Sequence, residues 1–208
     1  IYLIIFTYSH YLKLYATFFQ ANTPLVKGMS MKVSQSIIVE GRRVVYDRIG
    51  EADTAVIFVH GGFGSSSELW HSTMQSLPNF IRSEAPPEGY SVANFAKRLT
   101  MLPAALGLER PVIVGHSMGG VVCQLASIIA PETFGGMVLV GTGPSMRNHG
   151  VGQQLLDRLR TEGLSAQMMR EVSANWFHRE PPEWFFDAYV ARALTAPLDA
   201  MIDVQASL

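Results

Sequence analysis

Cysteine is almost absent from this chain: Cys123 is the only one in 208 residues, so no internal disulfide can form. Charged residues make up only 16% and the net charge is −1, which excludes the basic surface that nucleic-acid binding needs. No cluster of Cys and His has metal-ligand spacing, and neither a P-loop nor a Gly-x-Gly-x-x-Gly fingerprint occurs. We therefore expect no metal, no cofactor and no nucleic-acid partner, and a buried, unreactive Cys123.

Residues 1–19 form a run of apolar and aromatic residues, but the run lacks the features of a signal peptide or membrane span. Lys13 interrupts it, tyrosines and threonines dilute it, and no basic residue precedes it. We interpret residues 1–30 as an extension outside the fold, ahead of a natural start at Met29 or Met31, and expect a cytoplasmic protein. The alternative is membrane association through residues 1–19.

A serine at a sharp turn is the main chemical feature of the sequence. The apolar run Val112-Ile113-Val114 predicts a strand, and the uncharged residues 118–130, which stop at Pro131, predict a buried helix. Between them lies Gly115-His116-Ser117-Met118-Gly119, a Gly-x-Ser-x-Gly pattern. This pattern predicts a strained turn that exposes the hydroxyl of Ser117 as a nucleophile. A glycine-rich turn with an idle serine is the alternative.

The rest of the sequence alternates strand and helix patterns before a helical end. Two strand patterns meeting at Glu40-Gly41 predict a hairpin, and two continuous apolar runs predict strands buried in a parallel sheet. The hairpin strands are predicted at 34–40 and 42–48, the buried strands at 55–59 and 136–140, and helices at 66–77, 91–106, 151–162, 165–178, 182–194 and 197–208.

Two motifs together resemble the α/β-hydrolase family. The first is the loop His60-Gly61-Gly62-Phe63-Gly64 after a predicted strand, and the second is the serine turn, in the form common among esterases, thioesterases and perhydrolases. The resemblance implies an α/β fold, with a mostly parallel sheet flanked by helices over residues 31–144 and a helical cap over 145–208. It also implies Ser117 as nucleophile, with oxyanion donors from Met118 and from Gly62 or Phe63. Aromatic cap residues are expected to line a substrate pocket or to pack the cap on the core: Trp176, Trp184 and Phe185.

The sequence departs from the family pattern at two places, so we interpret the fold as partial. One interior strand is missing after Pro78, which removes the neighbour of the hairpin, and no acid or histidine matches a family position after the second buried strand. His149 and His178 fall in the predicted cap, as do Asp187, Asp199 and Asp203.

The functional prediction follows from these motifs and departures. We expect a serine hydrolase of a small-molecule carboxylic ester or thioester that forms an acyl-enzyme on Ser117, with little activity in this truncated polypeptide. The alternative is a non-catalytic variant that binds a small apolar ligand or a partner. The substrate and the oligomeric state stay open.

Overall fold

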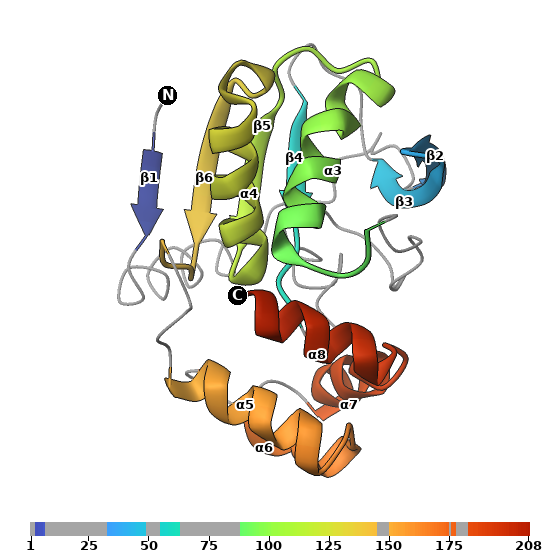
Figure 1. The fold of residues 1–208 in the computed structure, drawn as a ribbon, viewed down its shortest axis with the longest axis vertical. Coiled ribbons are helices and arrows are strands. Elements are labelled where there is room, and N and C mark those ends of the chain that lie inside the picture. Colours follow the sequence, from blue (N-terminus) through green and yellow to red (C-terminus); the bar gives the residue numbers. More distant parts are fainter. Residues whose placement is uncertain are drawn as a thin grey trace, which may run out of the picture.

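A parallel sheet forms the centre of the molecule (Figure 1). The computed structural model describes residues 3–6, 33–48, 55–62, 88–144, 150–174, 176–177 and 183–208. The sheet has the strand order β1-β6-β5-β4. Its strands are β1 (Leu3–Phe6), β4 (Val56–Val59), β5 (Val112–His116) and β6 (Gly136–Val140). The predicted α/β class and parallel sheet are confirmed.

Strand β1 departs from the extension predicted over residues 1–30. It pairs in parallel with β6, with Leu3 opposite Met137 and Phe6 opposite Val140. An unpaired edge of β6 would leave backbone N–H and C=O groups without partners, and an apolar four-residue segment satisfies them. The expectation that the whole extension lies outside the fold is therefore corrected for these four residues. Residues 7–32, which carry most of the proposed anchor, lie outside the described part of the chain.

The predicted hairpin is present but belongs to a separate sheet. Strands β2 (Val33–Val39) and β3 (Arg42–Arg48) are antiparallel, and they pair only with each other among the described residues. Glu40 and Gly41 join them with φ of 53° and 70°, the positive values of a tight type I′ turn. The Glu40 carboxylate forms a salt bridge with the Lys97 ammonium at 2.7 Å, which ties the hairpin to helix α3 (Val92–Ala105). Residues 79–87, where the sequence predicts that an interior strand is missing, lie outside the described residues.

Strand β4 is less buried than the sequence predicts. Val56 is 48% exposed, and the other three residues of the strand are partly buried. The reason is that β5 is its only partner strand in the described part of the sheet. The strand predicted from the continuous apolar run is therefore confirmed, but the prediction that it is fully buried is wrong.

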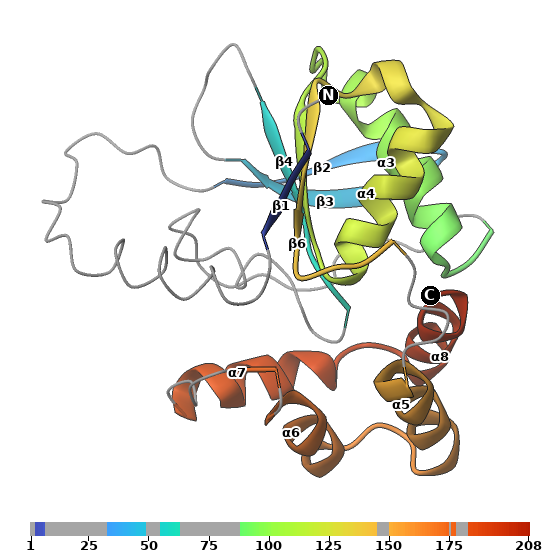
Figure 2. The same cartoon turned by 90° about the vertical axis from the view of Figure 1, so that its left-hand side faces the viewer.

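Helices α3 and α4 (Met118–Ile129) lie together on one face of the sheet, as the side view in Figure 2 shows. The core between them and the sheet includes Ile113, Val122 and Cys123. Burial raises the pKa of the Cys123 thiol to about 12, which confirms its role as an inert core residue. Pro103 lies inside the last turn of α3, which ends two residues later. The helix predicted at 66–77 lies outside the described residues.

In the described part of the chain four helices follow β6, and all four are confirmed near their predicted bounds. We call them the C-terminal helices: α5 (Gly150–Thr161), α6 (Ala166–Ala174), α7 (Glu183–Ala193) and α8 (Leu198–Ser207). They lie beyond the end of the sheet toward which the β6 arrow points in Figure 1. In a parallel sheet this carboxyl end is where ligands bind.

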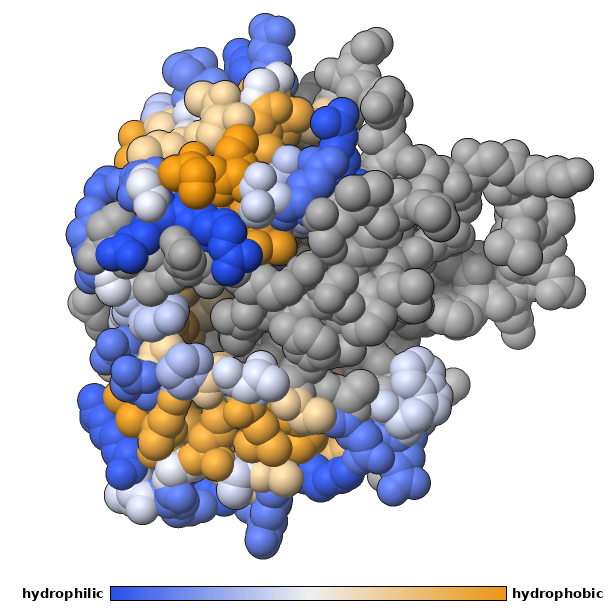
Figure 3. Space-filling view, turned by 90° about the vertical axis from the view of Figure 1, so that its right-hand side faces the viewer, coloured by the Kyte–Doolittle hydropathy of each residue, from blue (hydrophilic) through white to orange (hydrophobic). Residues whose placement is uncertain are grey.

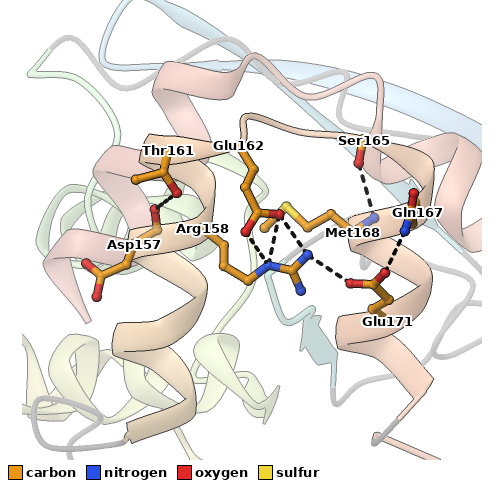
Figure 4. Close-up of polar contacts among 8 residues, drawn as sticks. All are labelled: Asp157, Arg158, Thr161, Glu162, Ser165, Gln167, Met168 and Glu171. Atoms are coloured by element: carbon orange, nitrogen blue, oxygen red, sulfur yellow. Dashed lines mark hydrogen bonds and ion pairs between the residues drawn. The ribbon is translucent and has the colours of Figure 1, made fainter.

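The C-terminal helices have their own core and their own polar ties. Leu159 and Met168 are fully buried between them, and hydrophobic residues form a band across them in Figure 3. The Arg158 guanidinium of α5 pairs with Glu162 at 2.8 Å and with Glu171 of α6 at 2.9 Å (Figure 4). These helices therefore hold one another independently of the sheet.

The last turn of α8 joins the C-terminal helices to the core. The Val92 N–H at the start of α3 donates to Ser207 Oγ at 3.0 Å, and Val204 and Leu208 pack against the main core. In the described ranges, none of the helices is long and apolar enough to cross a membrane.

Candidate active site

Ser117 lies at the turn between β5 and α4 in a strained backbone conformation. Its φ of 51° and ψ of −122° fall in a region that L-residues rarely adopt, and it is one of three non-glycine residues with positive φ in the described chain. The Ser117 N–H donates to Val140 O at 3.0 Å, which fixes the turn to the next strand. The predicted strand, turn and helix are therefore present, with Ser117 at their junction.

Three glycines permit this turn because the backbone around it leaves no room for a side chain. A Cβ on Gly115 would lie 2.7 Å from Gly120 Cα, and a Cβ on Gly119 would overlap the carbonyl oxygens of Val59 and His60. A Cβ on Gly120 would overlap the side chain of Thr142. The glycines of the motif thus reflect close approach of α4 to β4 and to the chain after β6.

The two segments predicted to form the oxyanion hole lie beside each other. A Cβ on Gly62 would lie 3.6 Å from the sulfur of Met118, so the loop after β4 reaches the residue that follows Ser117. Among the described residues, the Met118 N–H at the start of α4 has no hydrogen-bond acceptor. Such N–H groups at a helix N-terminus are suited to a developing negative charge. Phe63, the other predicted donor, lies outside the described residues.

His60 fixes the orientation of the peptide that precedes Gly62. Its Nδ1 lies 2.7 Å from the Gly61 carbonyl oxygen, and because a carbonyl only accepts, Nδ1 carries the proton. In a trans peptide the C=O and the next N–H point in opposite directions. Holding the Gly61 C=O toward His60 therefore directs the Gly62 N–H away from the histidine.

We expect His60→Ala to slow the reaction of Ser117 with a fluorophosphonate without unfolding the protein, because His60 is exposed and its loss frees the Gly61 peptide to rotate. A misdirected donor is expected to lower the rate constant for fluorophosphonate labelling by about tenfold, less than the 10²–10³ lost with a whole oxyanion donor. The labelling rate and the melting temperature are measured together. An unchanged labelling rate in a folded His60→Ala variant would rule out this orienting role.

His116, the residue before Ser117, is partly buried. Burial and the nearby His60 charge lower the pKa of its imidazole, so it is neutral at pH 7. Its ring packs over Gly141, where a Cβ would lie 3.7 Å from Cδ2 and Nε2. Gly141 has a φ of 54°, which favours glycine, and it turns the chain away at the end of β6.

The loop that follows β6 is attached to the same turn by a side chain that the sequence did not single out. Gln124 Nε2 donates to Gly120 O within α4 at 3.2 Å and to Gly143 O at 2.9 Å. Gln124 and Ser127 are the polar side chains of an otherwise apolar helix. A half-buried polar side chain in such a helix needs hydrogen-bond partners. The position of Gln124 in an apolar helix was therefore the feature of the sequence that could have indicated this contact.

No base or acid is assembled at Ser117 in the described part of the chain, where the Ser117 hydroxyl has no hydrogen-bond partner. Asp187 pairs with Arg170, and Asp199 accepts from the Ala200 N–H at 2.9 Å, so both acids serve the C-terminal helices. His149 and His178 lie outside the described residues. The prediction that no histidine and acid of this chain act together with Ser117 therefore stays a prediction.

The predicted pocket aromatics lie on or beside the C-terminal helices. Trp176 is 37% exposed and its ring meets Tyr189 edge to face at 6.2 Å between centroids, which is packing within these helices. Trp184 of α7 is 71% exposed. Phe185 belongs to the same helix, and its side chain is outside the described set. A role of these residues in a pocket stays a prediction.

Parts of this sequence are similar to the sequences of known enzymes. The pimeloyl-(acyl-carrier protein) methyl ester esterase of Wigglesworthia glossinidia brevipalpis is 28% identical over 103 residues, covering 46% of this chain and 39% of the esterase. The 2-hydroxy-6-oxo-6-phenylhexa-2,4-dienoate hydrolase of Comamonas testosteroni is 31% identical over 121 residues, covering 50% and 41%. This chain thus spans less than half the length of either relative.

The structural comparison gives the same fold. An esterase from Exiguobacterium antarcticum superposes with a TM-score of 0.71 over 85% of this chain and 73% of that chain, at 17% identity. A family model described as the alpha/beta hydrolase fold matches residues 54–196, which include both the His60 loop and the Ser117 turn. The match extends over more than half of the sequence, and the chain belongs to the alpha/beta hydrolase fold family.

Proposed function

We propose that this chain carries the nucleophile and the oxyanion hole of a serine hydrolase that cleaves carboxylic esters or thioesters. The observation that carries the proposal is the strained backbone of Ser117 between glycines that admit no Cβ. Strain of this kind costs about 1–3 kcal/mol and persists where function requires it. The methyl ester esterase relative supports ester cleavage, and the Comamonas testosteroni relative supports hydrolysis as the wider reaction class.

The proposed reaction has two steps. Ser117 Oγ attacks the carbonyl carbon of the substrate while its proton passes to a base, and the carbonyl oxygen becomes an oxyanion. The N–H groups of Met118 and of Gly62 or Phe63 stabilise that charge, each by about 2.7–4 kcal/mol. The alcohol or thiol then leaves with a proton, and water hydrolyses the acyl-enzyme to release the acid and restore Ser117.

The C-terminal helices are proposed as the cap of this site. They lie at the carboxyl end of the sheet, where β5 ends just before Ser117, and are tied to the core through Ser207 and Val92. The substrate is therefore proposed to bind between these helices and the turn. The family alone does not choose the acyl group, because one fold carries many substrates.

The proposal is tested by trapping the acyl-enzyme. The 208-residue chain is mixed with p-nitrophenyl acetate, and peptide mass spectrometry locates the acetyl group. We expect the acetyl group on Ser117, release of about one p-nitrophenol per chain in the first phase, and slow turnover afterwards. Ser117→Ala is expected to abolish the burst. Acetylation only at other residues, or an equal burst from Ser117→Ala, would overturn the proposal.

A second candidate function is non-catalytic binding of a small apolar ligand. This candidate applies if no histidine of the chain reaches Ser117, because a serine without a base loses about 10⁴–10⁶ in turnover. Saturable binding of an apolar ester that is never cleaved, together with no acylation of Ser117, would select this candidate. Rapid turnover that requires Ser117 would exclude it.

A further inference from the structure

Gln124 links the interior of α4 to the loop of residues 141–144 that follows β6. It donates to Gly120 O within the helix and to Gly143 O, which lies 19 residues further along the sequence. The Thr142 side chain of this loop lies where a Cβ of Gly120 would be, and just before the loop Val140 O, at the end of β6, accepts from the Ser117 N–H. Of these contacts, the Gln124 amide can be changed without altering the backbone of the turn.

The orientation of the Gln124 amide is dictated by its partners. Both contacts are carbonyl oxygens, which only accept hydrogen bonds, so the NH₂ group faces them and each of its hydrogens serves one. The reversed amide would place Oε1 against two carbonyl oxygens. This side chain therefore acts as a double donor that holds the Gly143 carbonyl at a fixed position over the first turns of α4.

The loop of residues 141–144 lies on one defined side of the nucleophile. Strand β5, which carries Ser117 at its end, pairs with β4 on one side and β6 on the other. The loop after β4 brings Gly62 to Met118, so the oxyanion side faces β4. The chain leaving β6 occupies the opposite side, at the carboxyl edge where ligands bind.

We propose that Gln124 is a positioning residue that holds residues 141–144 beside Ser117 and thereby limits the size of the substrate group on the β6 side. The inference rests on the proposed function of Ser117. In this arrangement the groups that stabilise the oxyanion lie on the β4 side of Ser117. The residues that limit the size of the substrate lie on the β6 side. Releasing the loop then changes which groups fit, while a small substrate still meets the same donors.

Two Gln124 variants separate this role from simple packing. Gln124→Met keeps length and volume but removes both donors, and Gln124→Glu places a carboxylate oxygen against two carbonyl oxygens. Gln167→Met is the matched control, because Gln167 also donates one side-chain hydrogen bond, to Glu171, on the exposed face of α6. Each variant is compared with the parent chain in amide hydrogen exchange and in labelling by a small ethyl and a bulky long-chain fluorophosphonate.

We expect faster amide hydrogen exchange at residues 141–143 in both Gln124 variants and no change from the parent in Gln167→Met. The ratio of bulky to small labelling rates is expected to change by about tenfold, the effect of one or two methylenes in a pocket. The small probe is expected to react within about threefold of the parent rate, because the donors at Met118 and Gly62 are retained. A merely structural role would slow both probes equally.

The outcomes distinguish the inference from the function on which it rests. If the parent chain is labelled at Ser117 but the Gln124 variants keep the parental probe ratio or the parental exchange, the positioning role is overturned. If the folded parent is labelled by neither probe, the proposed function fails, and the size-selection role fails with it. The inference is supported if both Gln124 variants exchange faster than the parent and show an altered probe ratio, while Gln167→Met matches the parent in both measurements.

Discussion

Gly119→Ala is expected to prevent the serine turn from forming and to destabilise the protein by more than about 3 kcal/mol, beyond the usual cost of overpacking. The added Cβ would overlap the carbonyl oxygens of Val59 and His60. These are backbone atoms at the end of β4, so no rotamer change relieves the overlap. Separation of α4 from β4 would disturb both oxyanion segments together. Urea unfolding and fluorophosphonate labelling measure the two losses.

The matched control is Gly150→Ala at the start of α5, where nothing lies within 4 Å of an added Cβ. Alanine at this helical position is expected to be neutral or to stabilise by up to about 1 kcal/mol, because it lowers the entropy of the unfolded chain. A Gly119→Ala variant that is as stable as Gly150→Ala, with parental labelling, would contradict the close packing of the turn.

Ser117→Gly is expected to be more stable than Ser117→Ala, the reverse of the usual order. Glycine adopts a φ of 51° and ψ of −122° without the cost that a Cβ brings, about 1–3 kcal/mol, and this exceeds the 0.5–1 kcal/mol that glycine normally loses to alanine. The predicted difference is about 1–2 kcal/mol. For a chain of this size it corresponds to roughly 3–6 °C in melting temperature.

Both Ser117 variants are expected to lose labelling completely, so stability and reactivity change in opposite directions in Ser117→Gly. This result would place backbone strain and the nucleophile at the same residue, as in other sites that store strain. Thermal melts of the parent and the two variants suffice. If Ser117→Ala melts at or above Ser117→Gly, the turn carries no strain and the argument from its backbone fails.

The serine turn could be predicted from sequence because every signal for it is local. The Val112 to Val114 run, the spacing of Gly115 and Gly119, and an uncharged helix ending before Pro131 all lie within about twenty residues. The hairpin at Glu40-Gly41 and the four C-terminal helices were predicted for the same reason. Local periodicity and turn chemistry determine such elements largely without the rest of the fold.

The contacts between distant segments could not be predicted in this way. Pairing of β1 with β6 joins residues more than a hundred positions apart, and no local pattern records it. The exposure of Val56 depends on which strand lies beside β4, and the role of Gln124 depends on where Gly143 is placed. Register and long-range side-chain partners arise from tertiary packing, which periodicity does not encode.

The measurement that tests the central claim most directly is the site of fluorophosphonate labelling in the 208-residue chain, with Ser117→Ala and Ser127→Ala as variants. Ser127 lies on the same helix, and its hydroxyl contacts Met137 Sδ at 3.8 Å. We expect labelling at Ser117 about 10³-fold faster than at any other serine, the acceleration that an oxyanion hole gives even without a base. Ser117→Ala should abolish it, and Ser127→Ala should leave it unchanged. Labelling spread over several serines of a folded chain, or unaffected by Ser117→Ala, would contradict the account.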